Sequence, residues 1–168
     1  TGSEYSNGIT TIPNGSSIVT GYFDGSATFG STTLNNVGDK DIFVAALDAD
    51  GNWINSIDLT APTFSSAATS TDGTKVVLTY NEALSSTTAA TSTFAVTTDG
   101  TANAITAVAV SGSTVELTLT NTIKANQAVT VAYNDPSSSD DANAVQDSAG
   151  NDAVSFSSTT VTNNSTIP

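Results

Sequence analysis

The chain of 168 residues contains no cysteine, histidine, methionine or arginine. Without cysteine it has neither a disulfide framework nor a thiol nucleophile, and without histidine it has no imidazole base. Zinc and iron sites that need sulfur or imidazole ligands are excluded for the same reason. The chemistry left to this chain is that of carboxylates and hydroxyls. We expect no enzyme; the alternative is a hydrolase that uses paired Asp residues in a cleft.

Positive charge is also scarce. Lys40, Lys75 and Lys124 stand against 16 Asp and Glu, and the formal net charge is −13. No basic patch can be assembled to neutralise nucleic-acid phosphates, so we expect no nucleic-acid partner. No apolar run has membrane-spanning length, and direct membrane insertion is not expected. An acidic chain rich in Ser and Thr is typical of proteins outside the cell, which predicts an extracellular or cell-surface location.

The pattern of the whole chain predicts strands. Short runs rich in Val, Ile, Thr, Phe and Tyr alternate with Asn-Gly, Asp-Gly and Ser-Gly turns, which is typical of an all-β protein. In "TVELTLT" (114–120), apolar and polar residues alternate as in a strand with one buried face. About seven such runs follow residue 60, the number expected for an immunoglobulin-like antiparallel β-sandwich. They are "PTFSSA", "KVVLTY", "TFAV", "AITAVAV", "TVELTLT", "AVTVAY" and "AVSF" followed by "TTVT".

The first 58 residues have a different pattern of apolar residues. "SIVTGYF", "ATFG", "TTL" and "DIFVAAL" predict a small set of strands, and "DIFVAAL" (41–47) is apolar on both faces. A strand of that kind is covered on both sides, so we expect this module to be incomplete alone and to pack on the second domain or on another copy. Pro62 forces an extended conformation on the preceding residue, which favours a boundary in "DLTAP". The predicted domains are 1–58, a blade-like β module, and 59–168, a β-sandwich.

The phrases "VTGYF", "ATFG" and "DIFVAALDADGNW", in this order within Gly15–Trp53, resemble one copy of a bacterial β-propeller repeat. The resemblance implies that Asp48–Asn52 is a turn after a blade strand. The residues agree: in a calcium loop that starts at Asp48, the glycine position holds Trp53 and the bidentate Glu position holds Leu59. A single copy cannot close a propeller, so it is a remnant, a fragment or a module completed by other subunits.

The remainder, about Asp58–Pro168, resembles the SwmB-like immunoglobulin-like repeat of bacterial surface proteins and adhesins. The phrases that carry the resemblance are "TAP", "LTYNEAL", "AVAVSGSTVELTL" and "QDSAGN". It implies a β-sandwich that serves as a spacer or association module, with no catalytic centre to carry over.

Oxygen ligands gather near the predicted boundary. One lies in the linker, one follows the second strand of the sandwich and three lie before its last strand: Asp58, Glu82, Asp147, Asn151 and Asp152. If the strand ends meet at one pole, these groups form a calcium site that stiffens the joint. The alternative is that Asp147 caps a turn, Gly150 and Asn151 take left-handed conformations, and Glu82 is solvated. The acidic segment "NDPSSSDDANAVQD" (134–147) is either a functional loop or a mobile, solvated one.

The leading hypothesis is a non-enzymatic structural subunit or repeat module of an extracellular bacterial assembly, such as an adhesin, a surface layer or a filament. Its partners are copies of itself or neighbouring repeats, which associate by packing of β-sheets. The alternatives are a virion decoration or fibre protein and a carbohydrate-binding module of a secreted protein, which recognises a glycan or a host surface. The carbohydrate hypothesis requires an exposed row from the aromatic group Tyr22, Phe23, Phe29, Phe43 and Trp53.

Overall fold

A computed structural model describes residues 3–54, 56–87, 89–137 and 140–168. These residues form antiparallel β-sheets and a single short 3₁₀ turn, η1 (Thr91–Thr93), which confirms the prediction of an all-β protein. In this part of the chain no helix has the length and the apolar character needed to cross a membrane. The chain forms two compact units, Thr1–Leu59 and Thr60–Pro168.

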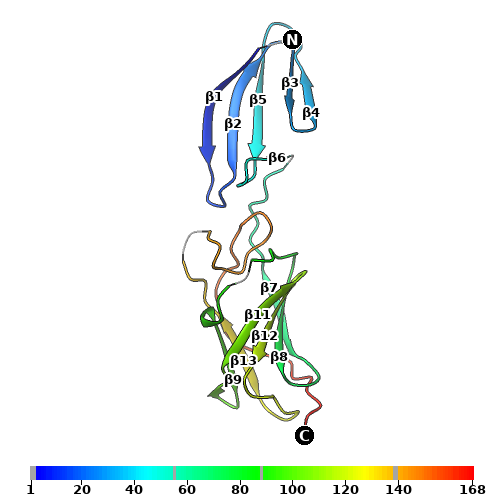
Figure 1. The fold of residues 1–168 in the computed structure, drawn as a ribbon, viewed down its shortest axis with the longest axis vertical. Helices are drawn as coiled ribbons and strands as arrows, with labels where there is room; N and C mark the ends of the chain where they lie inside the picture. The colour runs from blue at the N-terminus through cyan, green and yellow to red at the C-terminus, as the bar shows by residue number, and fades with distance from the viewer. Residues whose placement is uncertain (1–2, 55, 88, 138–139) are drawn as a thin grey trace. The chain divides into compact units, whose positions relative to one another are not determined.

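The first unit is a sheet of order β1-β2-β5-β6 with a separate hairpin, β3-β4 (Figure 1). The sheet strands are β1 (Glu4–Thr11), β2 (Ser17–Phe23), β5 (Asp41–Leu47) and β6 (Trp53–Ile54). The hairpin strands are β3 (Ser26–Phe29) and β4 (Thr32–Asn35). Because β2 pairs with β5 and not with β3, consecutive strands do not form one continuous four-stranded blade.

One face of this sheet carries a small core. Val19 and Phe23 of β2, Phe43 of β5 and Ala27 of β3 are buried together. The ring of Phe29 lies 4.6 Å from that of Phe43, so the hairpin covers this face of the sheet. Alternation along β2 and β5 directs the intervening residues to the opposite face.

The second unit is a sandwich of two antiparallel four-stranded sheets, of order β11-β12-β8-β7 and β10-β9-β13-β14. The first sheet consists of β7 (Phe64–Thr69), β8 (Lys75–Tyr80), β11 (Ile105–Ser111) and β12 (Thr114–Leu119). The second consists of β9 (Phe94–Thr98), β10 (Thr101–Ala102), β13 (Val129–Tyr133) and β14 (Phe156–Thr160). The hairpin predicted at Ser111-Gly112 joins β11 to β12.

The core of the sandwich follows the alternation in the sequence. β8 and β12 bury every second residue from one sheet, and β9 and β13 do the same from the other. The side chains that meet are Val76, Leu78, Tyr80, Val115, Leu117, Leu119, Phe94, Val96, Val129, Val131 and Tyr133. Phe64 and Phe156 close one end of this core with rings stacked 4.2 Å apart.

The C-terminal segment ties the two sheets together. After β14 pairs with β13, Thr162 crosses to the other sheet and forms a parallel bridge with Ala68 of β7. Asn163 Nδ2 then donates to the carbonyl groups of Lys124 and Gln127, at 2.8 and 2.9 Å. We call residues 161–167 the C-terminal strap.

Candidate functional site

The predicted ligands Asp147 and Asn151 lie in one tight hairpin, residues 146–152. Asp147 Oδ1 accepts hydrogen bonds from the N–H groups of Ala149 and Asn151, at 2.8 and 3.0 Å, and Asn151 Nδ2 donates to Asp147 Oδ2 at 2.7 Å. Gly150, at φ +90°, supplies the left-handed residue that the turn needs. Both polar side chains are buried. Asp147 thus caps the turn and Gly150 is left-handed, as one interpretation of the sequence expects, whereas the left-handed conformation expected of Asn151 is not found.

Asp48–Asn52 is built in the same way. Asp48 Oδ1 accepts from the N–H groups of Asp50 and Asn52, and Asn52 Nδ2 donates to Asp48 Oδ2 at 3.0 Å. These hydrogen bonds, first those from Asn52, lower the pKa of Asp48. Gly51 has φ +84°. "DADGN" (48–52) and "DSAGN" (147–151) therefore form the same Asp-x-x-Gly-Asn turn, once in each unit. The spacing of Asp, Gly and Asn that the two segments share is the signal in the sequence for this turn.

The other predicted ligands are Asp58, Glu82 and Asp152. Glu82 has a carboxylate oxygen within 4.8 Å of one of Asp147, next to the bridge between Leu84 and Asp147. Asp58 belongs to the first unit, where its carbonyl accepts from Asn14 Nδ2 at 3.0 Å. Asp152 makes its contacts elsewhere. Asn151 and Asp152 are adjacent in sequence, but the side chain of Asn151 bonds to Asp147 within the hairpin and that of Asp152 bonds to Asp141 in the loop.

Asp152 faces the acidic loop that leads out of β13. Its Oδ2 accepts from the N–H of Asp141 at 2.8 Å, and its own N–H donates to Asp140 Oδ1 at 3.2 Å. Only 8% of the residue is exposed, and its Oδ1 is buried without a hydrogen-bond partner among the described residues. Asp141 in turn accepts from Ser137 Oγ at 2.5 Å and from Asn143 N–H at 2.7 Å.

Asp135, Asp140, Asp141 and Asp152 form an acidic cluster in which negative charges lie close to one another. Burial raises the pKa of Asp152 to about 6, against the hydrogen bond from Asp141 N–H, and the charges of Asp135, Asp140 and Asp141 add to the rise. The hydrogen bond from Ser137, followed by that from Asn143, lowers the pKa of Asp141 and keeps it ionised. In this acidic cluster, negatively charged side chains therefore surround the buried carboxylate of Asp152.

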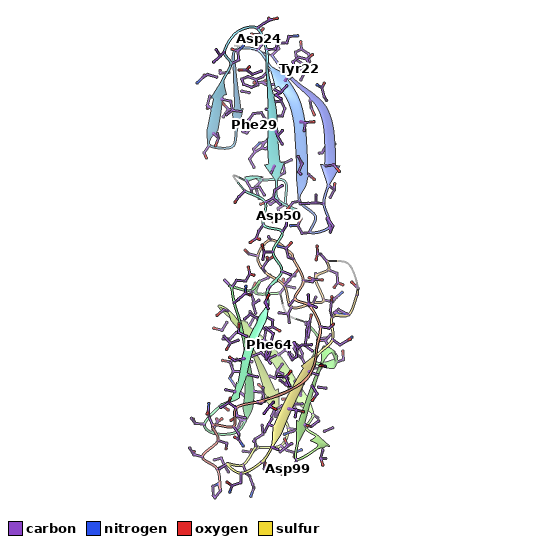
Figure 2. All side chains as sticks on the ribbon, turned by 180° about the vertical axis from the view of Figure 1, so that it is seen from behind. Tyr22, Asp24, Phe29, Asp50, Phe64 and Asp99 are labelled. Atoms are coloured by element: carbon purple, nitrogen blue, oxygen red, sulfur yellow. The ribbon has the colours of Figure 1, made fainter. Side chains whose placement is uncertain are left out.

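The two lysines of the second unit, both described, lie away from that charge. Lys75 pairs with Glu116 on the outer face of β8 and β12, at 2.6 Å. Lys124 begins the turn that ends at Gln127, whose side chain donates to Asp99. Asp99 lies at the pole of the second unit away from the acidic loop (Figure 2). Lys40 lies in the first unit, 4.6 Å from the centre of the Tyr22 ring.

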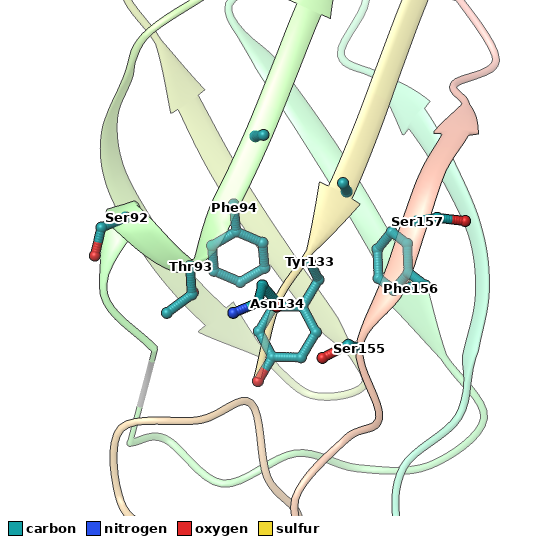
Figure 3. Close-up of a pocket in the computed structure, with 10 residues that line it drawn as sticks. Ser92, Thr93, Phe94, Tyr133, Asn134, Ser155, Phe156 and Ser157 are labelled. Atoms are coloured by element: carbon teal, nitrogen blue, oxygen red, sulfur yellow. The ribbon is translucent and has the colours of Figure 1, made fainter. Parts of the chain in front are cut away.

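A shallow groove of about 370 Å³ runs beside β9, β13 and β14 (Figure 3). Its walls carry small polar side chains and the edges of Phe94, Tyr133 and Phe156. The hydroxyl of Tyr133 accepts from Val145 N–H at 2.9 Å, and burial raises the pKa of this tyrosine to about 12. The described lining of the groove therefore offers no nucleophile or base suited to neutral pH.

The face of the first sheet opposite its core is open. On it Ile42 is 84% exposed and Val44 71% exposed. The register places Ile18, Thr20 and Tyr22 of β2 beside Ala46, Val44 and Ile42 of β5, and Tyr5 of β1 stacks on Tyr22 at 4.9 Å. None of these side chains is charged. We call this the open face; a groove of about 290 Å³ at its end is lined by Ile18, Val44, Ala45, Ala46, Ile54, Ser56 and Ile57.

The aromatic group of the first unit is not an exposed row. Phe23 and Phe43 are buried in the core, and Phe29 packs between Phe43 and Trp53, with its ring 5.1 Å from that of Trp53. Trp53 is 40% exposed and Tyr22 lies on the opposite face. Phe23, Phe29 and Phe43 fill the space between sheet and hairpin, which is the usual role of large rings in a core.

Two comparisons with known proteins found a similar protein or family. Residues 57–138 match the family described as "Putative flagellar system-associated repeat". The N-terminal part of the bacterial S-layer protein SbsC is similar in structure, with a TM-score of 0.50 and 25% identity over 62% of this chain. The match covers 24% of that S-layer chain, so the present chain spans about a quarter of its length.

No curated protein matches the chain. The resemblance of the second part to a bacterial surface repeat is therefore supported for residues 57–138. The resemblance of Gly15–Trp53 to a propeller repeat finds no support, since the family match starts at residue 57.

Proposed function

We propose that this chain is a non-enzymatic structural module of an extracellular bacterial surface layer, in which copies associate through the open face of the first unit. The family match to a flagellar system-associated repeat and the likeness to an S-layer protein support a structural role at the cell surface. The composition agrees, because a chain without histidine and cysteine has no imidazole base and no thiol nucleophile.

The observation that carries the proposal is the exposure of Ile42 and Val44 in the middle of a regular sheet. An exposed apolar face on a regular element marks an interaction site. We take a second copy as the partner, because modules of a surface layer contact one another. Between two chains of net charge −13, the uncharged open face is the contact with the least electrostatic repulsion. The described strand positions of the open face hold no acidic side chain, and Lys40 lies at its edge.

Light scattering of the purified chain at increasing concentration tests this proposal. We expect the mass of the wild type to rise with concentration, and the double variant Ile42→Thr, Val44→Thr to remain monomeric, since threonine keeps the strand propensity and removes apolar surface. The matched control is Val37→Thr: Val37 is 88% exposed in the same unit but lies in the loop before β5. A monomeric wild type, or a double variant that associates like the control, refutes the proposal.

A further inference from the structure

β1 (Glu4–Thr11) leaves one edge of the first sheet without a neighbouring strand. It pairs with β2 on one side, and no described residue pairs with it on the other (Figure 1). Just after β1, Ile12 N–H donates to the carbonyl of Ser16 at 2.9 Å. Since the hydrogen-bonding groups of successive strand residues point to opposite sides, those of Ile9 and Thr11 point away from β2. This edge therefore presents backbone donors and acceptors with which a further strand can pair.

The other sheet edges in the described part of the chain are short or have a neighbour. β6 and β10 contain two residues each, and β3 and β4 contain four each. β7 is bridged by Thr162, β14 continues into the C-terminal strap, and β11 is contacted by η1 and β9. β1 has eight exposed residues without proline or lysine, and a bulge between Ser6 and Gly8 is its one irregularity. Long edges of this kind are templates for strand addition.

We propose that β1 pairs antiparallel with β1 of a second copy and so joins the sheets of two first units into one. We call this contact the edge pairing. It rests on the part of the proposed function that makes copies of the chain its partners. An open face that meets another open face joins two copies and is then used up. A layer needs at least one more contact, and the open edge of β1 supplies it.

The charge of β1 selects the antiparallel orientation. Glu4 is its one charged residue and stands at its first position. Parallel pairing in register places the two Glu4 carboxylates on adjacent strands, about 5 Å apart. Antiparallel pairing in full overlap separates them by the length of the strand, roughly 24 Å, which is beyond the range of screened repulsion in physiological salt. Each Glu4 then lies opposite the uncharged Thr11 of the other copy.

Antiparallel edge pairing has a two-fold axis perpendicular to the sheet, so the two open faces lie on the same side of the joined sheet. Tyr5 of β1 stacks on Tyr22 of β2 on this face, with ring centres 4.9 Å apart. The joined sheet therefore carries one wider uncharged face, which runs from β5 of one copy through both β1 strands to β5 of the other. On the opposite side, Ile9 is paired with Val19 of the core and is 68% exposed, and the second copy covers it.

A single pair of eight-residue strands is a weak contact. It buries far less than the roughly 1,200 Å² at which stable interfaces begin. Edge pairing alone therefore produces no dimers in light scattering, where a chain with a substituted open face remains monomeric. A covalent trap detects such a contact. The chain has no cysteine, so one introduced thiol in each copy reports where two copies meet.

The test is the rate of disulfide formation in single-cysteine variants along β1, with Gly8 left unchanged. Antiparallel pairing brings one central position of β1 opposite itself and holds its two Cβ atoms within disulfide distance. We expect the rate to peak at one such position, at about tenfold the rate of Thr106→Cys or more, and to fall toward Glu4 and Thr11. Thr106, the control, is an exposed residue of the edge strand β11. A flat profile, or rates equal to the control throughout, overturns the edge pairing.

A proline variant tests whether the backbone makes the contact. The N–H of Ile9 points away from β2, so Ile9→Pro retains the pairing within the sheet and removes a donor from the open edge. Ile9→Thr removes the same apolar side chain and keeps the N–H. With the fastest cysteine at another position of β1, Ile9→Pro is expected to lower the rate to that of Thr106→Cys, and Ile9→Thr to retain most of it. Trp53 fluorescence melts check that the first unit is folded in both. Equal rates in two folded variants contradict backbone pairing.

The open-face variant Ile42→Thr, Val44→Thr separates the edge pairing from the contact in the proposed function. In this variant the fastest cysteine of β1 is expected to remain the fastest, because edge pairing does not use the substituted side chains. If the profile holds while the wild type is monomeric in light scattering, the open-face contact fails and the edge pairing stands. If the wild type associates and the profile is flat, the edge pairing alone fails. A peak that the double substitution abolishes also overturns the edge pairing, since the open face then brings the β1 strands together.

Discussion

Gly73 stands at the tightest contact of the sandwich, and its replacement by alanine gives the sharpest prediction of stability. The residue lies in the turn between β7 and β8 at φ +66°. A Cβ atom there would lie 2.1 Å from the carbonyl oxygen of Ile123 and 2.9 Å from Ser165 Oγ. Ile123 is fully buried; its N–H donates to the Gly73 carbonyl at 2.9 Å, and its carbonyl accepts from Ser165 Oγ at 2.7 Å.

The cost of Gly73→Ala has two parts. A left-handed backbone costs a residue with a Cβ atom about 1 kcal/mol. Relief of the clash separates the turn from Ile123 and breaks the two hydrogen bonds, at about 1 kcal/mol each, so the expected total is about 3 kcal/mol. The matched control is Gly112→Ala, in the turn between β11 and β12 at φ +59°, where a Cβ atom meets nothing within 4 Å. Gly112→Ala is expected to lower the free energy of unfolding by about 1 kcal/mol, from the left-handed backbone alone.

Calorimetric melts of the whole chain measure the difference. About 2 kcal/mol corresponds to a difference in Tm of roughly 8 °C or more in a domain of this size. Trp53 is the only tryptophan of the chain, and its fluorescence follows the first unit, which neither variant changes. If the two variants lower the Tm of the second unit equally, then Ile123 does not pack against the turn and the reasoning fails.

Two further predictions concern buried groups of the sandwich. Tyr133→Phe leaves Val145 N–H buried without its acceptor, so we expect it to lower the free energy of unfolding in urea by about 1–2 kcal/mol. The Tyr80 hydroxyl has no partner among the described residues, so we expect Tyr80→Phe to leave this free energy unchanged or to raise it. Equal losses in the two variants would contradict the hydrogen bond assigned to Tyr133. The raised pKa of Asp152 predicts a pH dependence, because the folded state holds this proton more tightly than the unfolded chain, whose ordinary value is 3.8. The protonated Asp152 stabilises the folded state fully below pH 3.8, and this stabilisation is lost as the pH rises through about 6. The free energy of unfolding changes by at most about 3 kcal/mol over this range, and Asp152→Asn removes the change. Parallel pH profiles of the wild type and the variant would contradict the prediction. The ionisable groups that face this carboxyl are Asp135, Asp140, Asp141 and Tyr133.

The strands that bury one face could be predicted well from the sequence. "KVVLTY" and "SIVTGYF" coincide with β8 and β2 because alternation and β-branched residues agree in both. β1 was not predicted: its apolar residues Tyr5 and Ile9 are diluted by Ser, Asn, Gly and Thr, and all of its residues are exposed. The last strand was placed too early, because Ala153 is buried by the hairpin, through its bond to Val145, and not by a sheet.

The candidate site was harder to predict, for a physical reason. The sequence shows that Asp147, Asn151 and Asp152 are close along the chain, but their side chains leave a tight hairpin in different directions. Which residues each one meets depends on how the segment after β13 returns to the hairpin, and this is set by contacts distant in sequence, such as that of Tyr133 with Val145. The two faces of "DIFVAAL" differ within the chain: Phe43 is buried, whereas Ile42 and Val44 are exposed, and the element expected to cover them stays a prediction.

The C-terminal strap has a mechanical consequence. Thr162 runs parallel to β7, the first strand of the same unit, and the backbone bonds Thr69 N–H to Thr162 O and Thr162 N–H to Ala67 O are both 2.9 Å long. Tension that pulls the two ends of this unit apart acts along both segments in opposite directions. It therefore loads these bonds, and those of Thr69 Oγ1 with Asn163 and Asn164, in shear and all at once, instead of opening them one by one. A module linked end to end in a lattice under turgor or flow would resist force at this pairing first.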